Sequence, residues 1–424
     1  MSVTRYLVVV SLDALGASDL EDLGELPTLA FLKENGAHVK RVTSIYPSLT
    51  YPAHTTIVTG HYPATHGIVN NTKIQPEKES PDWYWYRDAI KVPTLYDVAK
   101  KAGLKTAAFL WPVAARSSID YNIAEIFPNR FWLNQMMVSL WGSSPGFLID
   151  MNRKFGHLRR GIAQPELDDF LIAAVEDTIV RKKPNLTLAH FVDMDSMRHA
   201  YGVRSNEAKA ALKRHDERLA RIIAATKQNG TYDETTFIVL GDHYQIDVHT
   251  AIQLNVLFAK KGWQTLKETQ IVAWQVYAKS CDGSCYIYTK EIGLASEIRE
   301  LLKGLEGIET IYSQEEASQL GADKTCTFML EAKAGYYFKD QAVGALTQVI
   351  SKEDMGSPDY YRAVHGYSPQ KSDYATTLIA FGKGIREGIT IEAARLIDEA
   401  PTFARILNID LPDTKGQVLE DILK

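Results

Sequence analysis

The sequence predicts an α/β fold built on a mostly parallel β-sheet, and two observations support this prediction. Short apolar runs rich in β-branched residues alternate along the chain with longer segments whose apolar residues recur at helical spacing. Several of these runs show no alternation of polar and apolar residues, which is typical of strands buried on both faces of a parallel sheet. The chain has 424 residues, 45% of them hydrophobic and 23% charged, which is ordinary for a globular protein and suggests two to three domains.

The composition also excludes several classes of protein. It does not fit a disordered chain, a collagen-like fibre or a coiled coil, and the net charge of −5 argues against a stable nucleic-acid partner. Three cysteines imply no disulfide framework. The apolar run Leu7–Val10 is too short for a signal peptide or a membrane span. We therefore expect a cytoplasmic protein without a membrane partner; the sequence leaves the oligomeric state open.

The first third of the chain is predicted to alternate strands and helices. Tyr6–Leu12 is an apolar, β-branched run typical of a buried strand. Pro27 suits the first turn of a helix that Gly36 ends, and a strand follows it. Pro93 precedes a helix over Thr94–Ala102, after which Lys105–Leu110 reads as the next strand.

The same alternation continues to the end of the chain. Apolar residues of Glu166–Lys182 fall on one helical face, which makes this the clearest predicted helix. The other predicted elements are strand Leu186–Val192, helix Glu207–Gln228, strand Thr235–Leu240, strand Thr376–Phe381, and helical segments Ile391–Ile397 and Pro401–Leu407.

Two stretches fit the alternation less well and suggest a division into domains. Residues 122–156 are rich in Trp, Met, Phe and Ser, and we expect them to form a small cap over the site. Residues 251–359 mix short strand-like runs with helices, and we expect a lid or subdomain there. Residues 1–250 and 360–424 would then form the core.

Acidic residues follow three of the predicted strands. Asp13 follows the first strand, Asp193 and Asp195 follow Leu186–Val192, and Asp242 follows Thr235–Leu240. Ligands of parallel α/β sheets bind beyond the carboxyl ends of the strands, so these side chains should meet.

Two histidines accompany these carboxylates. His199 stands four residues after Asp195, which places both on one face of a helix, and His243 directly follows Asp242. Carboxylate and imidazole ligands without cysteine suit a catalytic zinc ion or another first-row divalent cation. The alternative for the first pair is an Asp that caps a helix and a solvated His.

Thr50 lies just ahead of a predicted helix, with Pro52 in the first turn. Free N–H groups and the helix dipole at such a terminus favour an anion such as phosphate. A Thr hydroxyl that faces a divalent cation can become a nucleophile. Capping of the helix is the more common role of a Thr in this place.

The stretch Tyr46-Pro-Ser-Leu-Thr50-Tyr-Pro-Ala-His-Thr-Thr-Ile-Val-Thr-Gly60 resembles a known motif. It is similar to Pro-Thr-x-Thr-Phe-Pro-Asn-His-x-x-Ile-Val-Thr-Gly of the nucleotide pyrophosphatase/phosphodiesterase (type I phosphodiesterase) family, in the alkaline phosphatase superfamily. Further resemblances are Tyr62 to Asn71, Asp195 to Gly202, Asp242-His243 and His365-Gly-Tyr. They imply an alkaline phosphatase-like three-layer sandwich with a mostly parallel central sheet and a smaller cap or lid subdomain.

The resemblance also implies the site. Thr50 would be the nucleophile, and Asn71 would hold a non-bridging phosphate oxygen. Two Zn²⁺ ions, or Mn²⁺ or another divalent cation, would be bound by the ligands of the family. One ion would be held by Asp195, His199 and His365, and the other by Asp13, Asp242, His243 and the Thr50 oxygen.

The expected function is hydrolysis of a small-molecule phosphodiester or of a nucleotide pyrophosphate bond through a covalent phosphothreonine. The alternatives are a phosphate monoesterase or phosphonate (C–P) hydrolase, and an inactive relative that binds a phosphorylated ligand. A monoester needs more positive charge, which Arg198 or Lys73 could supply. Arg198 replaces a Gly of the family motif, and His190 stands where a nucleoside-stacking Tyr is expected, so nucleotide specificity stays open.

Overall fold

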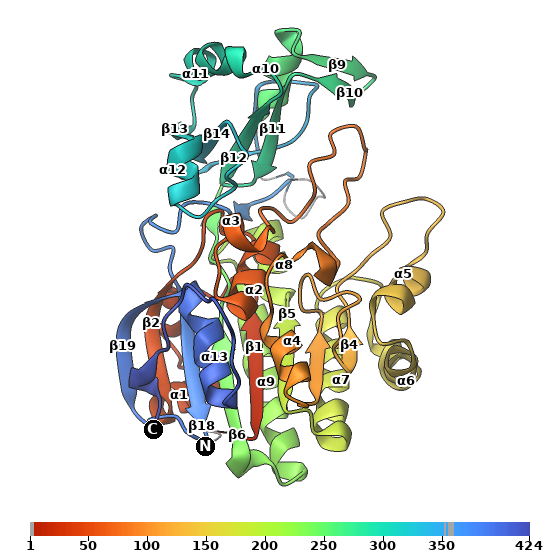
Figure 1. Ribbon diagram of the computed structural model, residues 1–424, viewed down its shortest axis with the longest axis vertical. Helices are drawn as coiled ribbons and strands as arrows, with labels where there is room; N and C mark the ends of the chain where they lie inside the picture. Colours follow the sequence, from red (N-terminus) through yellow and green to blue (C-terminus); the bar gives the residue numbers. More distant parts are fainter. Residues whose placement is uncertain (1–3, 352, 355–359) are drawn as a thin grey trace.

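A computed structural model describes residues 4–351, 353–354 and 360–424. Its centre is an eight-stranded sheet in the order β19-β2-β18-β6-β1-β5-β3-β4 (Figure 1). Only β18 runs antiparallel to its neighbours within this sheet, so the predicted α/β class with a mostly parallel sheet is confirmed. The strands are β1 (Tyr6–Leu12), β2 (Ala37–Thr43), β3 (Thr106–Phe109), β4 (Tyr121–Ile123), β5 (Leu186–Phe191), β6 (Thr235–Leu240), β18 (Thr376–Gly382) and β19 (Ile389–Arg395).

Helices cover both faces of the sheet and form a three-layer sandwich. On one face the sheet packs against α2 (Thr50–Thr59), α4 (Leu95–Lys101) and α13 (Glu399–Leu407). The opposite face packs against α1 (Pro27–Asn35), α7 (Glu166–Lys182) and α9 (Asn206–Gln228). Every residue of β1, β5 and β6 is buried, because helices lie on both sides of these central strands.

Most predicted elements agree with the structure to within two residues, but one prediction is wrong. Residues 391–397 are not helical: Ile389–Arg395 is strand β19, and a short 3₁₀ turn, Leu396–Asp398, follows it. β19 pairs in parallel with β2 at the edge of the sheet. An edge strand is only partly buried, so its pattern resembled that of a surface helix.

Residues 122–156 lie beside the opposite edge of the sheet. They contribute most of β4, and then helices α5 (Gln135–Gly142) and α6 (Pro145–Phe155) follow. Figure 1 shows α5 and α6 outside β4, next to α7. The predicted role of this segment as a cap over the site stays a prediction.

Residues 250–351 build a second lobe beyond the carboxyl ends of the central strands (Figure 1). A pairing of β7 (Ile246–Asp247) with β17 (Ala363–Val364) joins the segments that lead into and out of the lobe. The division into a core of residues 1–250 and 360–424 and a lobe of residues 251–359 stays a prediction. The strands of the lobe are β8 (Thr250–Ile252), β9 (Gln264–Lys267), β10 (Gln270–Trp274), β11 (Val276–Cys281), β12 (Ser284–Thr289), β13 (Ile308–Ser313), β14 (Phe328–Ala332), β15 (Tyr336–Phe338) and β16 (Thr347–Val349). Its helices are α10 (Leu254–Lys260), α11 (Ala295–Leu302) and α12 (Gln314–Gln319).

Two short helices complete the core, α3 (Pro63–His66) and α8 (Asp193–Tyr201). Among the described residues, none of these helices is both long enough and apolar enough to cross a bilayer.

Candidate active site

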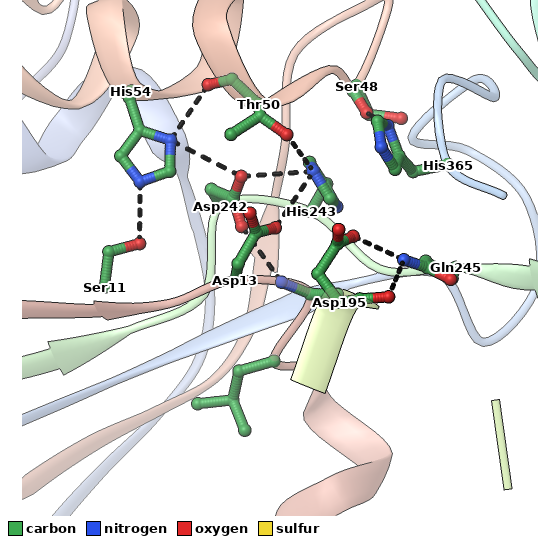
Figure 2. Close-up of polar contacts among 12 residues, drawn as sticks. Ser11, Asp13, Ser48, Thr50, His54, Asp195, Asp242, His243, Gln245 and His365 are labelled. Atoms are coloured by element: carbon green, nitrogen blue, oxygen red, sulfur yellow. Dashed lines mark hydrogen bonds and ion pairs between the residues drawn. The ribbon is translucent and has the colours of Figure 1, made fainter. Parts of the chain in front are cut away.

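The three central strands β6, β1 and β5 deliver their polar residues to one place. Asp13 follows β1, Asp195 lies in the first turn of α8 after β5, and Asp242 and His243 follow β6 (Figure 2). Because these strands are parallel neighbours, their carboxyl ends meet at the same edge of the sheet. The structure therefore brings together the acidic strand ends that the sequence singled out, except Asp193, which is turned away into an ion-pair cluster with Arg214 and Arg218.

Asp195, His199 and His365 form the first cluster, with one potential ligand atom of each within 4.8 Å of the others. Asp195 and His199 lie one turn apart on α8, as expected from their spacing. The His199 Nδ1 atom lies 2.8 Å from the carbonyl oxygen of Ala363, and the His365 Nδ1 atom lies 3.2 Å from that of Ser48. Donation from Nδ1 leaves Nε2 of both rings as a lone-pair donor, which is the usual arrangement of metal-binding histidines.

The residue after His365 must be glycine. Gly366 has φ +82°, and a Cβ atom there would lie 1.7 Å from the carbonyl oxygen of Cys281. The close approach lets the backbone N–H of Gly366 donate to Ser48, which also holds the His365 ring. The His-Gly-Tyr motif thus has a steric cause.

Asp13, Asp242 and His243 form the second cluster and are all buried. The His243 Nε2 atom lies 3.4 Å from Oδ1 of Asp13 and 3.2 Å from Oδ2 of Asp242. Those two carboxylate oxygens have no hydrogen-bond partner among the described residues. Buried, unpaired carboxylate oxygens around an imidazole are costly unless a cation neutralises them, so this donor set fits a divalent metal ion.

The electrostatics of the second cluster support the same fit. Burial and the charge of Asp195 raise the pKa of Asp13 to about 7. Burial and the charge of Asp13 raise the pKa of Asp242 well above its usual value. Burial and the neighbouring His365 ring lower the pKa of His243 far below its usual value, so this imidazole is neutral and can act as a ligand. A bound cation would favour the ionised form of both carboxylates.

Thr50 begins helix α2, and its hydroxyl does not cap the helix. The N-cap residue is Leu49, without a side-chain hydrogen bond to the backbone. The Thr50 Oγ1 atom instead lies 3.1 Å from Nε2 of His243 (Figure 2). The geometry therefore places the hydroxyl against the second cluster and not on the helix backbone.

Asn71 lies beside the same helix terminus. Its Oδ1 atom accepts a hydrogen bond of 2.9 Å from the backbone N–H of Tyr51. This contact fixes the side chain next to Thr50, and both residues line the same pocket. The Asn71 NH₂ group is thereby positioned as a donor for an oxygen bound near Thr50.

Two further histidines contact the carboxylates of the second cluster. His54 lies 2.9 Å from both the Thr50 carbonyl oxygen and the Ser11 hydroxyl, and 3.5 Å from Oδ2 of Asp242 (Figure 2). His190 lies 3.0 Å from Oδ2 of Asp13 and 3.0 Å from the Leu110 carbonyl oxygen.

The sequence could not assign either histidine to this network. Burial opposes protonation of His190, but the hydrogen bonds and charges of Asp13 and Glu125 raise its pKa well above the usual value. Its ring therefore donates from both nitrogens and holds Asp13, and it does not line the pocket. A signal existed for His54, since it stands one helical turn after Thr50.

Gln245 supports the first cluster. Its side-chain amide donates to the Asp195 carboxylate (Figure 2). Sequence reasoning did not identify this residue as part of the site. An amide donor on a ligand carboxylate fixes the orientation of that ligand.

The clusters face a pocket of about 460 Å³ between the core and the second lobe. Thr50, Asn71, Trp83 and Glu125 line the core side. Lys279, Asp282, Lys339, Asp340 and Tyr361 line the other side, and Lys279 pairs with Asp340 at 2.5 Å. The sequence did not identify the residues of the lobe, because their approach depends on how the lobe packs on the core.

The two cations that could have favoured a monoester lie elsewhere. Arg198 is buried and donates to Asp19 at 2.6 Å and to the Ala14 carbonyl, with Tyr244 stacked against its guanidinium. Lys73 lies over the ring of Tyr84. Neither side chain lines the pocket.

Comparison with known proteins agrees with the geometry. The sequence profile described as type I phosphodiesterase / nucleotide pyrophosphatase matches residues 7–368. Human ectonucleotide pyrophosphatase/phosphodiesterase family member 5 is 22% identical over 418 residues, 94% of this chain and 74% of that protein. Human family member 1 is 27% identical over 254 residues, 57% of this chain but 23% of that protein, so the chain spans less than a quarter of the length of this relative.

Solved structures show the same fold. Murine member 5 superposes with a TM-score of 0.70 at 22% identity, covering 99% of this chain and 100% of the other. Human member 5 gives a TM-score of 0.71 at 21% identity, with the same coverage. The alkaline phosphatase-like fold predicted from the resemblance is therefore confirmed, and the chain belongs to the type I phosphodiesterase / nucleotide pyrophosphatase family.

Proposed function

We propose that this protein is a two-metal hydrolase of phosphodiester or nucleotide pyrophosphate bonds with Thr50 as its nucleophile. One observation carries the proposal. The Thr50 hydroxyl, at the N-terminus of α2, does not cap the helix but lies against the second cluster of potential metal ligands. It also lines the same pocket as the first cluster. Membership of the family supports hydrolysis of such bonds.

The two clusters would hold two divalent cations. Their carboxylate and imidazole donors favour Zn²⁺. Asp195, His199 and His365 would bind one, and Asp13, Asp242, His243 and the Thr50 oxygen would bind the other. When bound, they would supply positive charge that favours ionisation of the Thr50 hydroxyl and stabilises the leaving oxygen.

The residues of the chain then have distinct roles. The Thr50 oxygen, after releasing its proton to water, forms a bond to phosphorus while the bond from phosphorus to the leaving oxygen breaks. Asn71 and the N-terminus of α2 hold the non-bridging oxygens. Water then attacks the phosphothreonine, which releases the phosphate monoester and restores the Thr50 hydroxyl.

The relatives support this assignment by analogy. The proteins that this chain resembles are described as nucleotide pyrophosphatases/phosphodiesterases. A structure of murine member 5 is described as an inactive Thr-to-Ala variant in complex with AMP. Both descriptions agree with a threonine nucleophile and a small nucleotide-like substrate for this chain.

The charge of the pocket favours a diester over a monoester. Of the two lysines that line the pocket, Lys279 is paired with Asp340 and Lys339 lies over the ring of Tyr360, while Arg198 and Lys73 lie outside it. A direct comparison of bis-p-nitrophenyl phosphate, p-nitrophenyl phosphate and a phosphonate tests this point. We expect the highest kcat/KM with the diester; faster turnover of the monoester or of the phosphonate would reject it.

Three variants test the nucleophile. Thr50→Ala should lower kcat by about 10³-fold or more and keep the metal, since six of seven ligands remain. Thr50→Ser keeps a hydroxyl and should keep partial activity. Asp242→Ala removes a ligand carboxylate, so bound metal should fall together with kcat. Each variant is compared after circular dichroism confirms folding, and near-native kcat in Thr50→Ala would refute the covalent route.

Metal analysis separates the enzyme from an inactive phospholigand-binding relative. We expect about two divalent ions per chain after gentle purification, and activity that returns when Zn²⁺ or Mn²⁺ is added to chelated protein. Less than about one ion per chain without rescue would favour the inactive relative.

We also propose a cytoplasmic location. It is supported by three buried cysteines that form no disulfide, Cys281, Cys285 and Cys326.

A further inference from the structure

An exposed apolar surface lies beside the active-site pocket and has no role in the proposed chemistry. Seven of the fourteen large apolar side chains that are exposed in the described part of the chain fall between residues 131 and 162. Phe131 is 96% exposed and Trp132 is 63% exposed, and their rings contact each other at 4.7 Å. The others are Met136, Met137, Trp141, Ile149 and Ile162. We call residues 129–162 the apolar-basic surface.

The exposed side chains are not needed for packing of helix α5. Val138 and Leu140 turn inward and pack against the buried clusters of the core. Met136, Met137 and Trp141 of the same helix are exposed. Exposed patches of large apolar side chains usually mark an interaction site.

The charge of this surface opposes that of the whole protein. Residues 129–162 contain five Lys and Arg residues and a single Asp, a net charge of +4 in a chain of net charge −5. Arg153 and Arg160 are exposed, with only solvent-accessible acidic partners at 3.7 Å and 3.5 Å. Such pairs are weak, so both arginines can interact with an external anion.

These features indicate what binds to the apolar-basic surface. We propose that the apolar-basic surface docks the protein on an anionic phospholipid bilayer. Trp, Phe and Met side chains combined with a basic rim are typical of proteins that lie at the membrane interface. A two-fold dimer through this face would place the exposed Arg153 and Arg160 of one copy against the same arginines of the other, which disfavours a second copy.

The surface is tied to the rim of the pocket. Arg130 and Asn129 both bind the Asp82 carboxylate, and the neighbouring Pro81 and Trp83 line the pocket. Docking through residues 129–162 would therefore hold the pocket close to the lipid surface. This proposal of peripheral binding departs from the expectation, drawn from the sequence, that the protein has no membrane partner, and it does not depend on the proposed hydrolysis.

Vesicle cosedimentation of the full chain tests the proposal. The probes are vesicles of phosphatidylcholine alone and vesicles with about 30% phosphatidylserine. We expect at least tenfold stronger binding to the anionic vesicles, with most of this difference lost at about 0.5 M NaCl. No binding to anionic vesicles, or equal binding to both kinds, would overturn the proposal.

Matched variants locate the surface. The triple variant Phe131→Ser/Trp132→Ser/Trp141→Ser and the charge variant Arg153→Glu/Arg160→Glu should each weaken binding at least tenfold. The controls Ile292→Ser/Val349→Ser and Arg5→Glu/Lys303→Glu change exposed residues elsewhere and should bind within twofold of the wild type. Equal losses in variants and controls would refute the location.

Two further readouts distinguish other outcomes. All four variants should hydrolyse bis-p-nitrophenyl phosphate in solution at the wild-type rate. Vesicle binding is measured separately, so a lack of hydrolysis in every protein would reject the proposed function without affecting the test of binding. Size-exclusion chromatography reports self-association. A wild-type dimer that the Phe131→Ser/Trp132→Ser/Trp141→Ser variant dissociates, without vesicle binding, would assign the face to a second copy instead.

Discussion

Replacement of Arg218 by Met should destabilise the protein strongly, because Arg218 neutralises a buried acidic cluster behind the site. Its guanidinium is 2.9 Å from Asp193, 2.9 Å from Asp169 and 3.5 Å from Asp168. Asp168 and Asp193 have no exposed side-chain surface. Asp168 in turn accepts hydrogen bonds from the backbone N–H groups of Val192 and Asp193, where helix α8 begins. The cluster therefore sets the start of the helix that carries the first group of ligands.

The magnitude follows from the charges that Arg218→Met leaves behind. Removal of one partner from a buried ion pair costs about 3–5 kcal/mol, and Asp193 keeps Arg214, so we expect about 3 kcal/mol. Burial already raises the pKa of Asp168 to about 6 against the opposing charge of Arg218. Without that charge its pKa rises further, so protonation at about pH 5 should recover part of the loss.

Urea unfolding followed by circular dichroism measures this effect. Arg221→Met on the same helix is the matched control, since Arg221 pairs with Glu176 at the surface and should cost less than about 1 kcal/mol. The reasoning is refuted if Arg218→Met loses no more free energy of unfolding than Arg221→Met, or if its loss is the same at both pH values.

Three other predictions concern acid–base balance and metal binding. Burial raises the pKa of Glu331 to about 7, above its value of 4.5 in the unfolded chain, so its contribution to stability falls as pH rises between these values. Glu331→Gln keeps an acceptor for the Tyr46 hydroxyl. Its free energy of unfolding, relative to that of wild type, should therefore increase by up to about 3 kcal/mol between about pH 5 and pH 8. A difference in urea unfolding that does not change with pH contradicts this. Gln245→Ala frees the Asp195 carboxylate and should weaken metal affinity about 10–100-fold in a chelator titration, whereas unaltered affinity would exclude a supporting role. Chelated protein should show a higher Tm after addition of Zn²⁺, and no shift would argue against the metal sites.

The core of the fold was predictable because its strands are buried on both faces. β1, β5 and β6 are short, mostly apolar runs in which every residue is buried, and such runs have few alternatives in an α/β chain. The edge strand β19 was mistaken for a helix, although Ile389 and Ile391 alternate with polar residues. Partial burial and the helix-forming residues Glu392 to Arg395 obscured this alternation.

The site was predictable to the extent that it depends on strand ends and motifs. The carboxyl ends of adjacent parallel strands must meet, so the clustering of Asp13, Asp195 and Asp242 follows from topology. The contribution of Lys279 and Asp282 did not follow, because it requires the second lobe to fold over the edge of the sheet. The pairing of His190 with Asp13 likewise depends on side-chain register between β1 and β5.

Capture of the phosphorylated enzyme tests the central proposal most directly. Wild-type protein is mixed with bis-p-nitrophenyl phosphate, quenched in acid within the first turnovers, digested and analysed by mass spectrometry. We predict a phosphoryl ester on Thr50, a burst of p-nitrophenol that matches its amount, and neither signal in Thr50→Ala. Steady turnover of the diester by wild-type protein without a burst and without modified Thr50 would contradict the covalent route.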